Sequence, residues 1–298
     1  MKANPVLKKL GLSGDDRAVI IHADDVGMCQ ASLAAYTDLV DFGLVSAASV
    51  MVPCPWFPAT AAVCRDNPGK VDMGVHLTLT SEWDGYRWGP VSTRDVASGL
   101  VDEDGYFYAS TEAAQAKGEP GAVGREIKGQ VERALAAGID VTHIDSHMGT
   151  VFHPLYLGAY VEVALQHGIP PLLLRKDQTE LRELGIDAEA AALFADQLRM
   201  LEAQGLPLLD DLYQMPLDQP DDRLQQVKAV FEGLQTGITY LLIHPAKDTP
   251  ELRGITPDWP SRVADYETFT SEALRTFVQE EGIHVLGWRA LREVMRAQ

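Results

Sequence analysis

Residues 18–25 read Ala-Val-Ile-Ile-His-Ala-Asp-Asp, a short apolar run that ends in two neighbouring carboxylates. Such a run, bounded by polar residues, is typical of a buried strand. An amphipathic helix is expected over residues 28–42, and Gly43 would end it because glycine readily adopts the left-handed conformation found there. The segment therefore predicts a strand followed by a helix, with Asp24 and Asp25 at the strand's carboxyl end.

The same alternation continues along the chain. Further strands are predicted at residues 46–52, 72–80, 141–146, 171–175, 208–213, 239–244 and 285–286, and helices at 56–65, 124–137, 153–167, 187–204, 221–234 and 270–281. About eight strands alternating with helices favour an α/β fold with a mostly parallel sheet that forms a closed or nearly closed, deformed (β/α) TIM-like barrel. We expect a single domain over residues 1–298, with residues 81–121 as a long loop insertion after the third strand.

Composition and charge narrow the classes of partner. The chain has 25 Lys and Arg against 43 Asp and Glu, a formal net charge of −18, so its long-range field repels nucleic acid and anionic lipid. The apolar segment 42–64 is interrupted by Pro53, Pro55 and Pro58, which argues against a membrane span. The three cysteines show no CxxC spacing and no signal-peptide pattern is evident, so we expect a cytoplasmic protein.

Histidine and aspartate gather at the ends of the predicted strands. Asp24 and Asp25 follow the first strand, His76 lies in the third, His147 follows the fourth and His244 ends the seventh. Because the carboxyl ends of barrel strands meet at one rim, these side chains can share a pocket. One carboxylate and two imidazoles suit a divalent metal with open positions. We expect Asp25, His76 and His147 to hold one divalent ion, Mg or Zn, with Asp24 as general base and His244 as general acid.

Four spaced motifs also carry a family resemblance: Ala23-Asp24-Asp25-x-Gly27, Gly74-Val-His-Leu-Thr-Leu-Thr80, His143-x-Asp-Ser-His147 and His244-Pro245. In this order they resemble the motifs of the YdjC-like carbohydrate deacetylases, a group that includes chitooligosaccharide deacetylase. The resemblance implies a metal-dependent hydrolase that removes acetyl from an N-acetylated sugar or oligosaccharide with metal-activated water. It implies the same ligands, base and acid, and a possible homodimer. Met148-Gly149-Thr150 stand where chitooligosaccharide-type members tend to carry further histidines, so the sugar stays open.

Sugar recognition calls for aromatic faces and a few fixed polar groups. One set of candidates follows the third strand, and a second set lies in a loop after His244 bounded by prolines. Asp145 is a further candidate, either touching substrate or orienting a ligand imidazole. The expected substrate-binding residues are Trp83, Tyr86, Arg87, Trp88, Asp145, Trp259 and Arg262.

Two other functions stay open at this point. A metal-dependent hydrolase or isomerase on another small substrate would use the same ligands, although the chain has no Gly-rich phosphate loop. A non-catalytic sugar-binding barrel would need the aromatic residues but not the pair Asp24 and Asp25. His22, His143 and His153 fit a structural or a functional role equally well.

Overall fold

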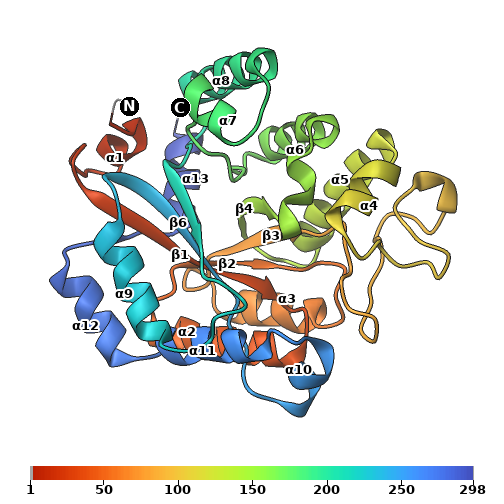
Figure 1. Ribbon diagram of the computed structural model, residues 1–298, viewed down its shortest axis with the longest axis horizontal. Coiled ribbons are helices and arrows are strands. Elements are labelled where there is room, and N and C mark those ends of the chain that lie inside the picture. Colours follow the sequence, from red (N-terminus) through yellow and green to blue (C-terminus); the bar gives the residue numbers. More distant parts are fainter. Residues whose placement is uncertain (1–2, 298) are drawn as a thin grey trace.

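Seven parallel strands form the centre of the computed structural model, which describes residues 3–297 (Figure 1). Along the sheet the order is β4-β3-β2-β1-β6-β5, and β7 pairs with β1 near its start. Parallel neighbours require crossover connections, as the alternation of strands and helices predicted. The strands are β1 (Arg17–Val26), β2 (Ala47–Val50), β3 (Met73–Leu77), β4 (Val141–Ser146), β5 (Asp211–Gln214), β6 (Gly237–Ile243) and β7 (His284–Val285).

The barrel wall is incomplete between β4 and β5. Residues 171–175, expected as a full strand, form only isolated bridges: Pro171 pairs with Ile144 of β4, and Leu174 pairs with Leu209 just before β5. Proline has no N–H to give to a ladder, so the two prolines at 170 and 171 interrupt regular pairing here. The prediction of an eighth strand was therefore wrong, and the barrel is deformed at this point.

Helices surround the strands (Figure 1). The helices expected from the sequence are found, with bounds within a few residues of the predicted ones. The short helices α1, α4, α7 and α10 and the later helices α11 and α13 were not predicted. Trp259 and Pro260 open α11, since proline is compatible with the first turn of a helix. The helices are α1 (Pro5–Lys9), α2 (Gln30–Phe42), α3 (Phe57–Asp66), α4 (Thr111–Lys117), α5 (Pro120–Ala136), α6 (Pro154–His167), α7 (Gln178–Glu183), α8 (Ala188–Ala203), α9 (Arg223–Gly233), α10 (Pro250–Ile255), α11 (Trp259–Phe269), α12 (Glu272–Glu280) and α13 (Trp288–Arg296).

The long insertion after β3 is confirmed and is mostly irregular. It holds a single bridge between Trp83 and Tyr86, a 3₁₀ turn η1 (Val96–Ser98) and the helix α4. A second 3₁₀ segment, η2 (His147–Phe152), follows β4. None of the helices in the described chain is long and apolar enough to cross a membrane.

Strand β1 divides its side chains between two apolar clusters. Val19 and Ile21 belong to the larger cluster, whereas Ala18 and Ile20 pack with Trp288 in the smaller one. Because side chains alternate along a strand, His22 continues the row of Ala18 and Ile20. The row of Ala18, Ile20 and His22 thus begins in an apolar cluster and ends at the polar site at the carboxyl end of β1.

A β-bulge lies at the end of β1. Ala23 pairs with Ala48 and Val26 with Val50, so two residues of β1 stand opposite one residue of β2. Asp25 has a left-handed backbone with φ of 59°, which is uncommon for a residue other than glycine. The bulge breaks the alternation, and so the consecutive carboxylates of Asp24 and Asp25 can face the same site.

Candidate metal centre

Asp25, His76 and His147 converge on one point at the carboxyl ends of β1, β3 and β4. The Oδ1 atom of Asp25 lies 3.2 Å from Nδ1 of His147 and 3.5 Å from Nε2 of His76. This oxygen is buried and has no hydrogen-bond partner among residues 3–297. A buried carboxylate oxygen facing two imidazole nitrogens is suited to a cation, and the three residues form one of the groups able to hold a metal ion.

Each imidazole of this group is fixed from behind by a carboxylate. Nδ1 of His76 lies 2.8 Å from Oδ1 of Asp145, and Nε2 of His147 lies 3.1 Å from Oε2 of Glu82. Such contacts set the orientation and tautomer of histidine ligands in metal sites. The nitrogens left facing Asp25 are therefore Nε2 of His76 and Nδ1 of His147.

Arg262 fixes the other oxygen of Asp25. Its NH1 donates to Oδ2 of Asp25 at 2.8 Å, and its Nε donates to Oδ1 of Asp258 at 2.7 Å. The charge of Arg262 and contacts with the two histidines overcome the effect of burial, and hold the pKa of Asp25 well below its usual range. Asp25 is therefore an anion with one oxygen bound and one oriented toward the imidazoles.

The carboxylates also act on the imidazoles. Burial opposes protonation of His76, but the carboxylates of Asp145 and Asp24 outweigh it and raise the pKa of His76 well above its usual value. In the same way Glu82 and Asp25 outweigh burial and raise the pKa of His147 to about 9. A divalent cation bound between the three residues would compensate the same negative charge.

Asp24 and His244 lie beside this group. Oδ2 of Asp24 is 3.7 Å from Nε2 of His76 and 3.9 Å from Nε2 of His244. The backbone N–H of His244 donates to Oδ2 of Asp265, which anchors the residue at the end of β6. Burial lowers the pKa of His244. The structure thus brings together all five residues that the sequence suggested for the metal, the base and the acid.

The sequence and the fold both have known relatives. The family model described as YdjC-like protein matches residues 18–280. The chain belongs to this family. A protein named carbohydrate deacetylase from Thermus thermophilus is 35% identical, over 97% of this chain and 99% of that relative. A protein with the same name from Listeria welshimeri is 23% identical, over 92% and 99%. A solved structure from Enterococcus faecalis, whose name suggests cleavage of cellobiose phosphate, has the same fold, with TM-score 0.73, 23% identity and coverage of 93% and 99%.

The aromatic residues after β3 have different positions in this YdjC-like chain. Trp88 is buried and its indole N–H donates to the Thr80 carbonyl, so it packs in the core and presents no open face. Trp83 is partly buried and lies under the Arg262 guanidinium, 5.7 Å from it. The Tyr86 hydroxyl donates to the Met28 carbonyl. Of these rings, Trp83 is the one that contacts Arg262, the residue bound to Asp25.

The remaining substrate candidates have structural partners. The Arg87 guanidinium donates to Asp102 and to the Phe107 carbonyl within the insertion. Asp145 is buried and accepts hydrogen bonds from Ser49 and Tyr240 besides its contact with His76. Trp259 and Arg262 lie on α11 and not in a loop, because the expected loop is helical. Arg262 and Asp145 thus contact groups of the site from behind.

Glu82 and Asp258 were not among the residues singled out from the sequence. Glu82 comes six positions after His76, beyond the end of β3, and no spacing rule connects it to His147. Asp258 is the residue before α11, and its distance from the other motifs hides its contact with Arg262. In the sequence, each of these residues stands out only as an acidic residue in a segment next to a predicted strand or helix.

Proposed function

We propose that this chain is a metal-dependent carbohydrate deacetylase, a hydrolase of the amide bond in an N-acetylated sugar. The observation that carries this proposal is the unpartnered Oδ1 of Asp25 between the facing nitrogens of His76 and His147. The relatives named carbohydrate deacetylase support the class of substrate. We also propose that the chain forms a single catalytic domain and that two copies form a homodimer.

In this proposal Asp25, His76 and His147 hold one divalent ion, Mg or Zn. Bound there, the ion would polarise the acetyl carbonyl and lower the pKa of a water molecule. The residues fit such an ion because their donor set is one anionic oxygen and two nitrogens, each already oriented by a second carboxylate or cation.

Asp24 would take a proton from the attacking water. Its Oδ1 is engaged by Nδ1 of His22 at 2.7 Å, whereas its Oδ2 faces His76 and His244. A carboxylate with one oxygen anchored and the other directed into the site is well placed for general base catalysis. The proton can pass from Asp24 to His244, whose Nε2 is 3.9 Å away.

His244 would give this proton to the departing nitrogen as the C–N bond breaks. Its lowered pKa makes the imidazole neutral at rest and its protonated form a readier donor. Trp83, beside Arg262, and Trp259 at the start of α11 are the aromatic residues that we propose for sugar contact, because both keep part of their surface exposed.

The first experiment measures metal content and acetate release from a panel of N-acetylated sugars. Purified protein should bind about one divalent ion per chain and release acetate from at least one sugar. Metal binding without acetate release from any panel member would overturn the deacetylase proposal in favour of another metal-dependent reaction. Sugar binding by metal-free protein with no turnover under any metal would favour a binding protein.

Two variants separate the proposed roles. Asp24→Asn should keep the metal and lose most activity, about 100-fold or more, because the amide cannot accept the proton. His147→Ala should lose the metal itself. Retained turnover in Asp24→Asn would remove Asp24 as the base, and normal metal content in His147→Ala would remove His147 from the ligand set.

A further inference from the structure

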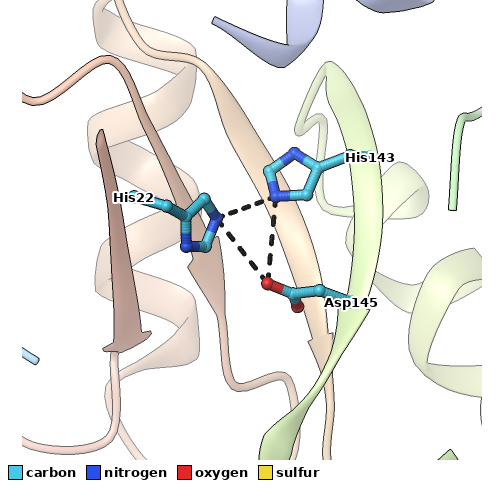
Figure 2. Close-up of side chains that lie close together, drawn as sticks. All are labelled: His22, His143 and Asp145. Atoms are coloured by element: carbon cyan, nitrogen blue, oxygen red, sulfur yellow. Dashed lines mark hydrogen bonds and ion pairs between the residues drawn. The ribbon is translucent and has the colours of Figure 1, made fainter. Parts of the chain in front are cut away.

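A second polar cluster lies directly behind the candidate metal centre. It consists of His22 on β1 and His143 and Asp145 on β4, with both imidazoles wholly buried (Figure 2). Nε2 of His22 is 2.8 Å from Nε2 of His143, and both nitrogens face Oδ2 of Asp145 at 3.6 and 4.0 Å. From the sequence, Asp145 was expected to touch substrate or to orient a ligand imidazole, and His22 and His143 fitted a structural or a functional role equally well.

The geometry favours hydrogen bonding over a second metal ion. Two nitrogens bound to one zinc at 2.0–2.1 Å with tetrahedral angles lie roughly 3.3 Å apart, farther than the 2.8 Å found between His22 and His143. Oδ2 of Asp145 already accepts hydrogen bonds from the hydroxyls of Ser49 and Tyr240, both at 3.0 Å. The two imidazoles therefore share a proton across the 2.8 Å contact.

Hydrogen bonds continue on both sides of this imidazole pair. Nδ1 of His22 meets Oδ1 of Asp24 at 2.7 Å. On the other side, Nδ1 of His143 lies 3.0 Å from Oγ1 of Thr142, and this hydroxyl lies 2.5 Å from Oδ1 of Asp72. The result is an unbroken chain of five side chains from Asp72, just before β3, to Asp24 in the candidate site.

Asp24 receives a hydrogen bond from His22. An ionised carboxylate can only accept, so the proton between His22 and Asp24 lies on Nδ1 of His22. At the other end of the chain the Thr142 hydroxyl donates to Oδ1 of Asp72, and its oxygen lies 3.0 Å from Nδ1 of His143. His143, whose pKa is lowered by burial, contacts the second nitrogen of His22 at 2.8 Å.

We propose that His22 is a positioning residue for Asp24, an Nδ1–H donor held in place by the hydrogen-bond chain that runs from Asp72 through Thr142 and His143. The inference rests on the proposed role of Asp24 as general base. With its Oδ1 held by His22, Asp24 directs Oδ2 toward His76 and His244. The imidazole of His22 thereby sets which oxygen of the base is available to water.

Packing keeps the two imidazoles in place. His143 stacks on the Trp288 indole, with ring centroids 4.9 Å apart and an angle of 12° between the planes. The Tyr240 ring lies 4.7 Å from His22. Gly74 of β3 leaves room for His143, since a Cβ atom there would come within 2.5 Å of the ring. Neither imidazole can turn without moving an aromatic neighbour or a strand, so the contact between the two rings is held in place.

The test compares two substitutions in the metal-loaded enzyme. The amide nitrogen of His22→Asn takes the place of Nδ1 and can still donate to Asp24, whereas His22→Leu fills the site without a donor. We expect His22→Leu to lower kcat about 10–100-fold, with KM within about twofold and metal content unchanged. His22→Asn should recover most of this loss. His284→Asn, at an exposed position on β7, is the matched control and should behave as wild type.

A spectroscopic measurement keeps the inference testable if a variant does not fold. Nitrogen chemical shifts of ¹⁵N-histidine-labelled wild-type protein report which ring nitrogens carry a proton, and we expect a proton on Nδ1 of His22. An unprotonated Nδ1 on His22, or equal kcat losses in both variants, would overturn the proposal. If wild type releases no acetate from any sugar, the proposed function fails, while the proton on Nδ1 still decides whether His22 holds Asp24.

Discussion

Substituting Gly74 by alanine tests how tightly the centre of the barrel is packed. A Cβ atom at position 74 would lie 2.5–2.6 Å from three atoms of the His143 ring, whereas ordinary contacts begin near 3.4 Å. The ring would have to move by roughly 0.9 Å, but Trp288 stacks on one side of it and His22 bonds to its edge. Overpacking of this kind costs about 1–3 kcal/mol.

The displacement also breaks a buried hydrogen bond. Loss of the contact between His143 and His22 leaves buried polar atoms unpaired, at a cost of about 1–3 kcal/mol. Gly74→Ala should therefore lower the free energy of unfolding by about 2–6 kcal/mol, measured by denaturant titration. Activity per folded molecule should fall as well, because His22 loses its anchor.

Gly158→Ala is the matched control. Gly158 lies within α6, and a Cβ atom added there meets no described atom within 4 Å. Alanine is favoured over glycine inside a helix by up to about 1 kcal/mol, so this variant should be as stable as wild type or more so. A Gly74→Ala protein within 0.5 kcal/mol (about a twofold change in the unfolding constant) of wild type would refute the packing argument. In a double-mutant cycle, Gly74→Ala should cost less in a His143→Ser background.

Three further changes test the surroundings of the site. Glu82→Gln, which keeps the shape but removes the charge behind His147, should weaken metal binding about 10–100-fold; an unchanged Kd in calorimetric titration would contradict that role. Arg262→Leu leaves the Asp25 carboxylate buried without its cation and should destabilise the protein by about 3–5 kcal/mol. This loss of stability should be smaller when metal is bound, because the metal also compensates the charge of Asp25. Equal losses measured with chelator and with metal would count against Asp25 as a metal ligand. Asp265 has its pKa raised by burial to about 6, so the folded state holds its proton more tightly than the unfolded chain does. The protonated Asp265 stabilises the folded state by about 3 kcal/mol below about pH 4, and this contribution is lost as the pH rises through 6. The difference in the free energy of unfolding between wild type and Asp265→Asn should follow this curve. A difference that does not change with pH would refute it.

The sequence predicted the strands where their residues alternate clearly. Strand β4 was expected over 141–146 and is found there. His143 and Asp145 stand on the polar row of that strand, so their meeting with other strand ends followed from the topology of a parallel barrel. The segment 171–175 was also apolar, but whether it pairs depends on both neighbouring strands and on two prolines, which periodicity does not capture.

The environment of the site was harder to predict. The register of β1 against β2 produces the bulge at Asp25. Register depends on both strands together, so it cannot be predicted from the sequence of either strand alone. Which tryptophan of the insertion is buried depends on how the loop folds over the barrel, and Trp88 and Trp83 look alike in the sequence. Glu82 reaches His147 through the same loop. Long-range contacts of irregular segments leave no periodic signal.

The bulge in β1 makes chain length at this point as important as residue identity. Removing one residue between Ala23 and Val26 would restore regular pairing with β2 and send one of the two carboxylates to the opposite side of the sheet. Inserting one residue would shift the start of α2 instead. A single-codon deletion or insertion here should therefore disable the site while leaving every side chain of the other motifs intact.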